Sequence, residues 1–242
     1  MTIRIAMWSG PRNLSTAMMR SFGSRSDTVV TDEPFYGAFL KQSGADQAMR
    51  EEVIASMDCD WASVAANLSG PATAPVWYQK HMAHHMIGPV DYDDLPGFRH
   101  AFLIRDPARV VKSYAKKRVT VTPEDLGCAR QQHFFDREAD RLGHAPPVVD
   151  SADVLADPEN ILTQLCAALG IPWDPAMLAW EPGGRATDGI WASHWYGQVL
   201  QSSGFEAALE TEVVLDASQR SVAKACRPYY EYLSKFALKS VI

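Results

Sequence analysis

The sequence predicts an α/β fold, a three-layer sandwich in which a mainly parallel β-sheet is flanked by helices on both faces. Two observations support this prediction. Short apolar runs alternate along the chain with segments of helical periodicity, which is typical of a parallel sheet with crossover helices. Polar clusters also follow several of these runs directly, and the ligands of such sheets bind at the carboxyl ends of the strands.

The predicted elements follow one another in alternating order. Strands are predicted at 3–8, 28–31, 76–80, 101–104 and 147–150, and helices at 17–22, about 46–68, 107 to about 117, behind the last strand, and at about 216–236. Proline and glycine clusters at 69–75, 144–147 and 181–184 indicate loops rather than linkers, and no internal repeat is present. We therefore expect a single domain over residues 1–242.

The first apolar run, Ile3–Trp8, leads into a turn rich in small and hydrogen-bonding residues. Gly10 permits a tight turn, and Ser15 and Thr16 can cap and open a helix whose first amides face a negative group. Arg12 adds a planar guanidinium that binds phosphate or sulfate oxygens in pairs. The loop lacks the Gly-Lys-Ser/Thr ending of a nucleoside triphosphatase loop, so an anion other than ATP is favoured. An ordinary strand-turn-helix with a solvated arginine is the alternative.

A second anion site is predicted where the apolar run His100–Ile104 ends. Arg105 places a charge at the end of this strand, Asp106 can cap the next helix, and Pro107 suits its first turn. Ser113 lies in the second turn of that helix, eight positions after Arg105, and an apolar stripe of the helix would face the sheet. Two anion sites are therefore expected on one sheet.

These paired motifs resemble those of the sulfotransferase superfamily, whose enzymes use 3'-phosphoadenosine 5'-phosphosulfate (PAPS) as donor. The resemblance implies a fold like that of P-loop nucleoside triphosphatases, PAPS as cosubstrate and 3',5'-ADP as product. It places the first turn at the 5'-phosphosulfate, and Arg105 with Ser113 at the 3'-phosphate. The segment Gly183–Trp191 is similar only in character to the loop that closes over adenosine in relatives. The cosubstrate-binding residues implied are Gly10, Pro11, Arg12, Asn13, Leu14, Ser15, Thr16, Arg105, Ser113 and Arg185.

The resemblance also has a departure. The tryptophan that stacks on adenine in many cytosolic relatives is replaced by Ala17, and Trp8, Trp191 and Trp195 remain as alternative aromatic partners. Their sequence positions do not decide among them.

Sulfuryl transfer requires a base for the acceptor and positive charge for the leaving phosphate oxygen. Arg12 suits the second task. The base has two candidates, since His81 resembles the histidine that relatives place after the third strand and Glu33 resembles the glutamate that other branches place after the second. His81 is favoured because histidine needs less tuning of its pKa, although the usual spacer after Lys80 is missing and leaves His84 as an alternative.

Composition sets limits on function. A net charge of −6 argues against nucleic acid as a partner. The sequence predicts no secretory leader and no apolar run long enough for a membrane span, so we expect a cytoplasmic protein without a membrane partner. The four cysteines lack metal-ligand spacing and are expected to be reduced thiols.

Other functions stay open at this stage. A phosphoryl-transfer enzyme of the nucleotide-kinase type would need magnesium and a phosphate-binding lysine, which this loop does not indicate. A catalytically silent nucleotide-binding protein could share the fold. The cluster His81, His84 and His85 could bind zinc, but no carboxylate or cysteine stands at a matching interval and no metal is expected. The acceptor is expected to be a small molecule with a hydroxyl or amine, and a homodimer is compatible with the sequence.

Overall fold

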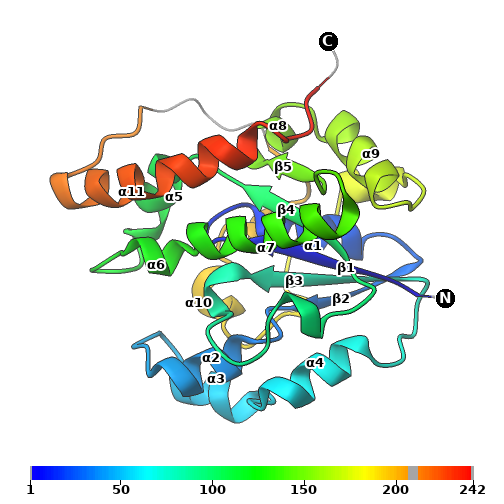
Figure 1. The fold of residues 1–242 in the computed structure, drawn as a ribbon, viewed down its shortest axis with the longest axis horizontal. Coiled ribbons are helices and arrows are strands. Elements are labelled where there is room, and N and C mark those ends of the chain that lie inside the picture. The colour runs from blue at the N-terminus through cyan, green and yellow to red at the C-terminus, as the bar shows by residue number, and fades with distance from the viewer. Residues whose placement is uncertain (1, 207–211, 241–242) are drawn as a thin grey trace.

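The computed structural model describes residues 2–206 and 212–240. Its centre is a five-stranded sheet in the order β2-β3-β1-β4-β5, and every neighbouring pair is parallel. The strands are β1 (Ile3–Ser9), β2 (Thr28–Asp32), β3 (Val76–Met82), β4 (Arg99–Ile104) and β5 (Val148–Asp150). The structure confirms the predicted α/β fold with a parallel sheet, and Figure 1 shows the strands running through the middle of the molecule.

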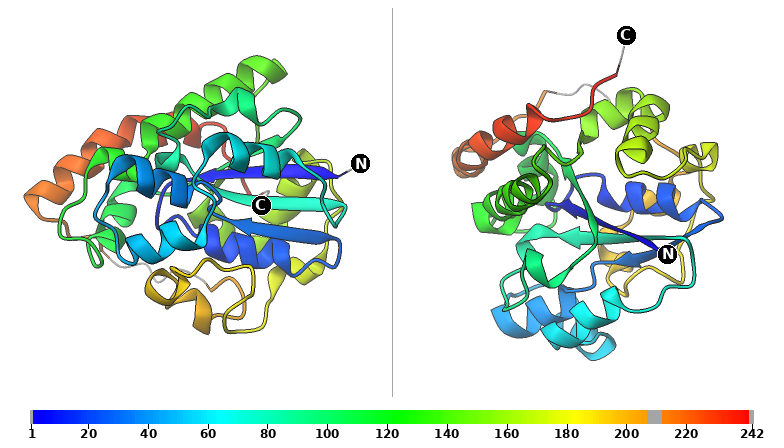
Figure 2. Two further views of the ribbon diagram at one scale, coloured as in Figure 1. Left: turned by 90° about the horizontal axis from the view of Figure 1, so that it is seen from below. Right: turned by 45° about the vertical axis from the view of Figure 1, so that its right-hand side comes forward.

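Helices connect the strands and cover both faces of the sheet (Figures 1 and 2). They are α1 (Ser15–Gly23), α2 (Tyr36–Ser43), α3 (Arg50–Ser56), α4 (Trp61–Ser69), α5 (Pro107–Tyr114), α6 (Pro123–Leu126), α7 (Cys128–Leu142), α8 (Ser151–Ala156), α9 (Pro158–Ala168), α10 (Ala192–Trp195) and α11 (Ala217–Ser234). The helices predicted at about 46–68 are α3 and α4, and α4 begins where Asp60 caps it by accepting a hydrogen bond from the Ser63 amide.

The alternation of side chains along β1 creates a core on each face of the sheet. Ile5 and Met7 pack with apolar residues of α1 and α9, whereas Ala6 and Trp8 pack with residues of α2, α4 and α7. All four side chains are fully buried. A central strand that is apolar on both faces is what a parallel sheet covered by helices requires.

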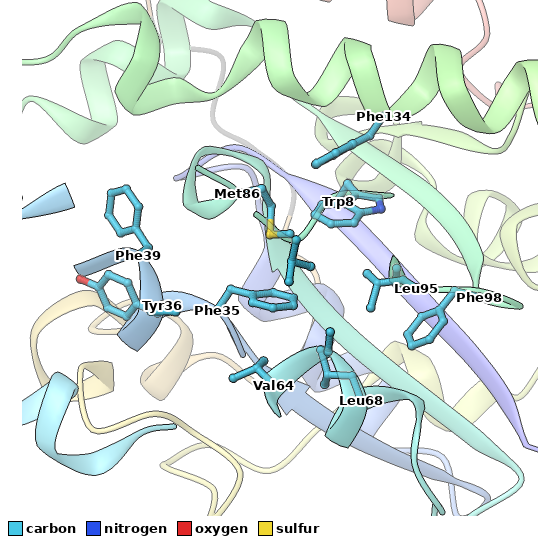
Figure 3. Packing of buried hydrophobic residues seen from close by; sticks show 14 of the residues in the cluster. Trp8, Phe35, Tyr36, Phe39, Val64, Leu68, Met86, Leu95, Phe98 and Phe134 are labelled. Atoms are coloured by element: carbon cyan, nitrogen blue, oxygen red, sulfur yellow. The ribbon is translucent and has the colours of Figure 1, made fainter. Parts of the chain in front are cut away.

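Trp8 lies at the middle of the second core. Figure 3 shows its indole facing Phe134 of α7, and the two ring centroids are 4.4 Å apart. The indole Nε1 donates a 2.8 Å hydrogen bond to Nδ1 of His100 on β4. Trp8 is therefore a core residue, and this position excludes it as the aromatic partner of a nucleotide in the cavity described below.

The strand register brings the carboxyl ends of β1, β2, β3 and β4 to one edge. Ser9 is paired with both Met82 and Leu103, and Asp32 is paired with Lys80. The polar segments that follow these strands consequently meet in space. In the part of the chain that the structure describes, no helix is long and apolar enough to cross a membrane.

Candidate functional site

A cavity of about 750 Å³ opens at this edge of the sheet. Its wall is built from the segments after β1, β2, β3 and β4 together with the segment 195–206. The residues predicted for the site that line it are Pro11, Arg12, Asn13, Leu14, Ser15, Thr16, Glu33, Arg105 and Ser113. Gly10, His81 and Arg185 are not on its wall. The structure thus brings the two sequence motifs into one cavity.

The loop after β1 has an unusual backbone. Arg12 and Leu14 adopt left-handed conformations, with φ of 59° and 70°, and Leu14 is the N-cap of α1 without any side-chain cap. The prediction that Ser15 and Thr16 cap this helix is therefore wrong, because the helix already begins at Ser15. A left-handed backbone conformation costs free energy in residues other than glycine, and such residues are concentrated at functional sites. The uncapped helix start directs its amides and positive dipole at the cavity.

Gly10 supports this loop from behind. A Cβ atom at this position would lie 2.6 Å from the carbonyl oxygen of Leu126. The glycine therefore allows the loop to pack against the end of α6.

Arg12 connects the two predicted anion sites. Its Nε donates a 3.0 Å hydrogen bond to Oγ of Ser113 on α5, and its carbonyl oxygen accepts a 2.7 Å hydrogen bond from Nη1 of Arg105. Arg12 and Ser113 are 101 positions apart in the sequence. Burial lowers the pKa of both arginines, and the proximity of Arg12 also lowers that of Arg105. Two guanidinium groups on the wall of one cavity are suited to bind anionic ligand atoms.

A buried ionic cluster lies beside the loop. Nζ of Lys80 on β3 donates to Oδ1 of Asp32 at 2.9 Å, to Oε1 of Glu33 at 2.7 Å and to Oη of Tyr196 at 2.6 Å. The Lys80 and Asp32 side chains are each 1% exposed. All three protons of the ammonium group thus have partners, which is the condition for burying a lysine.

The segment after α9 completes this cluster. Tyr196 donates from its hydroxyl to Oδ2 of Asp32 at 2.6 Å, and Trp191 Nε1 donates to the Tyr196 oxygen at 3.1 Å. The Gly189 amide donates to the same Asp32 oxygen at 3.2 Å. Figure 1 shows α10, which carries part of this segment, close to the carboxyl end of β3. Residues 189–196 therefore help to fix the Asp32 carboxylate at the end of β2.

Glu33 has the features of a functional carboxylate. It has a left-handed backbone with φ of 44°, and its side chain is 11% exposed on the cavity wall. Burial raises the pKa of Glu33 above its usual value, and the charge of Lys80 partly opposes that effect. The second carboxylate oxygen lies 3.9 Å from Nε2 of His85. Glu33 is thus held through one oxygen, and its other oxygen lies near His85, which also lines the cavity.

His81 does not reach the cavity. Its imidazole is 1% exposed, packs 4.6 Å from the Trp8 ring and interacts with the Gln79 side chain at 3.1 Å. The physical reason is that β3 continues to Met82, so Lys80 and His81 point to opposite faces of the sheet. Burial lowers the pKa of His81 to about 3. This location does not support the predicted role of His81 as the base.

His84 and His85 lie where the alternative base was expected. Both line the cavity from the 3-10 helix Ala83–His85, and the Nδ1 atom of each is buried without a hydrogen-bond partner. The His85 ring packs against both Tyr36 and Phe39, at centroid distances of 4.6 and 4.8 Å. Among the described residues, no group of three or more His, Cys, Asp or Glu side chains is arranged to hold a metal.

The Arg185 side chain forms hydrogen bonds within its own loop. Its Nη2 donates to the carbonyl oxygen of Glu181 at 2.6 Å, and its Nη1 donates to that of Gly184 at 3.2 Å. The structure therefore does not bring the predicted Arg185 to the cavity. The basic side chains that join the site are Arg109, Lys112 and Lys116, which line the cavity along and beyond α5.

Sequence reasoning missed the roles of Lys80 and Tyr196. Lys80 had a detectable signal, since it is a charged residue near the end of an apolar strand. Tyr196 had none, because it reaches Lys80 across 116 positions of sequence.

The comparison with protein families identifies the class to which this fold and site belong. The sequence model of the family "Sulfotransferase domain" matches residues 3–237. The chain therefore belongs to the sulfotransferase domain family. Two curated relatives from Arabidopsis thaliana, the branched-chain-amino-acid aminotransferase-like proteins 2 and 1, are 32% and 33% identical over 230 and 233 residues. Each alignment covers 95% of this chain but 41% of the relative, so the chain spans less than half the length of these relatives.

Solved structures show the same fold. A sulfotransferase from Alicyclobacillus acidocaldarius superposes with a TM-score of 0.57 and 11% identity. The alignment covers 100% of this chain and 98% of that structure's chain. The sulfotransferase domain from the curacin biosynthetic pathway gives a TM-score of 0.51 and 15% identity, covering 94% of this chain and 98% of its own. The architecture is thus that of sulfotransferases, although the sequences have diverged widely.

Proposed function

We propose that the chain transfers a sulfuryl group from PAPS to a hydroxyl or amine of a small-molecule acceptor in the cytoplasm. The observation that carries this proposal is the hydrogen bond between Arg12 and Ser113, which joins both predicted anion-binding motifs in one cavity. Membership of the sulfotransferase domain family supports the same reaction class. The amide-rich start of α1 suits the 5'-phosphosulfate, while Arg105 and Ser113 suit the 3'-phosphate.

In the proposed reaction the acceptor oxygen or nitrogen attacks sulfur in line with the departing phosphate oxygen. The bond from sulfur to the acceptor atom forms as the sulfur–oxygen bond to the 5'-phosphate breaks, and the electron pair of that bond stays on the phosphate. Arg12 and the amides of the loop stabilise the charge that grows on this oxygen, because they are fixed in place before the reaction begins. No metal is required for this role, since the side chains and the helix start supply positive charge.

Glu33 is the base in this proposal. It lies on the cavity wall and its raised pKa makes it a stronger proton acceptor than an exposed glutamate. The acceptor proton moves to Glu33 as the bond to sulfur forms. Lys80 holds one carboxylate oxygen and keeps the side chain oriented, and Tyr196 and Asp32 in turn hold Lys80. This assignment replaces His81, whose side chain lies in the core.

The proposal is tested by incubating the protein with PAPS and a panel of alcohols, phenols and amines, and by measuring the release of 3',5'-ADP in buffer containing EDTA. Acceptor-dependent release that is unchanged by EDTA is expected, and Arg12→Ala should abolish most of it. The same assay with ATP and magnesium examines the kinase alternative, and phosphoryl transfer there without any reaction of PAPS would disprove the proposal. Binding of 3',5'-ADP without turnover of any acceptor would identify a silent nucleotide-binding protein.

A further inference from the structure

Two cysteines lie against each other behind the proposed site. Cys128 is the first residue of α7, and Cys226 lies within α11. Cys226 belongs to a buried apolar cluster that joins α5, α6 and α11, and Cys128 packs against the same cluster. A hydrogen bond joins the two thiols. The fold therefore brings two sulfur atoms from distant parts of the sequence into contact, and both are free thiols in this structure.

The other two cysteines have different neighbours. Sγ of Cys59 lies 3.6 Å from the carbonyl oxygen of Ile54, and Sγ of Cys166 lies 3.7 Å from Sδ of Met177. A disulfide requires two sulfur atoms that can approach to bonding distance without movement of the backbone. Among the described residues, the pair that meets this condition is Cys128 and Cys226.

The contact between the two thiols favours the loss of one proton. Their hydrogen bond lowers the pKa of Cys226 and raises that of Cys128, since the sulfur that accepts the proton is stabilised as a thiolate. Cys128 also begins a helix of 15 residues whose N-cap, Gly127, provides no side-chain cap. The positive end of the helix dipole favours a thiolate at this position. The pair therefore holds a thiolate next to a thiol, and the thiolate is the form that oxidants attack.

Cys128 lines a second cavity, which is much smaller than the first. Its volume is about 30 Å³, and Cys226 is not on its wall. A water molecule needs about 10 to 15 Å³ of such volume. The cavity thus has room for a molecule with two oxygen atoms and is too small for a bulky oxidant such as glutathione disulfide.

The wall of the small cavity is partly polar. Asn13 and Arg105 line both cavities, so the small one lies directly behind the two predicted anion motifs. Oδ1 of Asn13 is buried and has no hydrogen-bond partner among the described residues. A small molecule with hydroxyl groups can donate to such an acceptor and recover the free energy that its isolation costs. Hydrogen peroxide has two hydroxyl groups, and it oxidises thiolates.

From this arrangement we infer that Cys128 and Cys226 form a reversible disulfide, with hydrogen peroxide as the oxidant that reaches Cys128. The Cys128 thiolate attacks one peroxide oxygen, the oxygen–oxygen bond breaks, and hydroxide leaves with its electron pair, so that Cys128 becomes a sulfenic acid. The Cys226 sulfur then attacks the Cys128 sulfur, and the sulfur–sulfur bond forms as a second hydroxide leaves. The two thiol protons and the two hydroxides give two water molecules, and the two sulfurs lose the two electrons that the peroxide gains.

The disulfide would join two elements that support the anion motifs. The carbonyl oxygen of Leu126, next to the start of α7, lies so close to Gly10 that a Cβ there would be 2.6 Å away. Arg227 follows Cys226 and pairs at 2.7 Å with Asp106, the N-cap of α5. The inference concerns a modification of the protein and does not rest on the proposed sulfuryl transfer, so failure of either leaves the other standing.

The test uses the full chain, which is reduced, freed of reductant and treated with a few equivalents of hydrogen peroxide. The remaining thiols are alkylated with N-ethylmaleimide in urea and located by peptide mass spectrometry. Two of the four cysteines should escape alkylation, and a linked peptide pair should contain Cys128 and Cys226. Dithiothreitol should return both to alkylation. Cys59, which is partly exposed, and Cys166, which is buried, are internal controls that should be alkylated throughout.

Two results of this experiment would overturn the inference. One is alkylation of all four cysteines at a peroxide concentration that oxidises glutathione in a parallel tube. The other is a link that involves Cys59, Cys166 or a second chain in place of the Cys128–Cys226 link. Neither result depends on a variant, so the inference is decided even where a substitution impairs folding.

Variants test the order of the two steps. In Cys226→Ala the oxidised Cys128 has no partner, so it should remain a sulfenic acid that dimedone labels. In Cys128→Ala dimedone should not label Cys226, because Cys226 is fully buried and is not on the cavity wall. Cys59→Ala is the matched control and should form the disulfide as the unaltered protein does. Dimedone on Cys226 but not on Cys128 in the two single variants would overturn the assignment of Cys128 as the sulfur that peroxide reaches.

Discussion

Arg20 on α1 and Asp188 form a buried bidentate ion pair across 168 positions of sequence. Both nitrogen–oxygen distances are 2.6 Å, and the side chains are 3% and 5% exposed. The backbone amide of Arg185 also donates to Asp188, at 2.8 Å. This pair anchors the segment that carries Trp191 and Tyr196 to α1, the helix that follows the Arg12 loop.

Asp188→Asn is therefore expected to be strongly destabilising. It leaves the Arg20 charge buried without its partner, a change that typically lowers the free energy of unfolding by about 3 to 5 kcal/mol. Asp153→Asn is the control, since Asp153 pairs with a largely exposed lysine, Lys239, and should cost about 1 kcal/mol or less. Urea unfolding measures both variants, and equal losses would show that the buried pair has no special structural role.

Arg105→Ala tests whether the two proposed phosphate sites act independently. The variant should weaken the binding of 3',5'-ADP by about 1.5 to 3 kcal/mol, the usual contribution of a charge-assisted hydrogen bond. It should hardly affect 5'-AMP, which lacks the 3'-phosphate. Isothermal titration calorimetry with both ligands measures the difference. A similar loss for the two would mean that Arg105 acts mainly through its hydrogen bond to the Arg12 carbonyl and supports the loop.

Glu33→Gln tests the base. The substitution preserves the shape of the side chain and removes the proton acceptor, so turnover should fall by roughly a hundredfold or more while 3',5'-ADP affinity stays within a few fold. In the unmodified protein, kcat/KM should rise with pH through the raised pKa of Glu33, because the ionised carboxylate is the active form. His81→Asn should retain turnover per folded molecule. A larger loss in that variant than in Glu33→Gln would return the role to His81.

Buried histidines predict a loss of stability in acid. Burial lowers the pKa of His81 and His84 to about 3 and that of His100 to about 4, from about 6.5 in the unfolded chain. The unfolded state thus binds more protons below pH 6.5, and stability falls as pH decreases from 6.5 toward 4. Each histidine contributes up to about 1.4 kcal/mol per pH unit.

Glu33 has a raised pKa, so its protonation favours the folded state as the pH falls. Its contribution therefore opposes that of the histidines and reduces the dependence of the unfolding free energy on pH. Urea unfolding at several pH values between neutral and mildly acidic measures the slope, and His100→Gln should make it shallower. A free energy of unfolding that is independent of pH over this range would contradict the prediction.

The fold could be predicted from the sequence because its signals are local. The buried strands are apolar, and Asp106 caps α5 by accepting hydrogen bonds from the amides of Ala108 and Arg109. The motif residues Arg12, Arg105 and Ser113 then met because parallel strands end at a shared edge.

The position of the base could not be predicted in the same way. The prediction ended β3 at Lys80, whereas the strand continues to Met82. A difference of two residues at a strand end decides whether His81 follows the strand or lies within it, and within it the pleat turns His81 toward Trp8. Tyr196 depends on contacts between distant segments, which no local pattern encodes.

The buried cluster around Lys80 has a consequence for the energy of proton transfer. Two carboxylates, Asp32 and Glu33, share one ammonium group, so the formal charge of the trio is −1 when all are ionised. A proton that reaches Glu33 brings this sum to zero. Because an uncompensated charge is costly in a buried environment, the protein interior favours a proton on Glu33, which suits the base role proposed for it. The trio thus carries a formal charge of −1 before the proposed reaction. Release of the proton from Glu33 to water restores this charge before the next turnover.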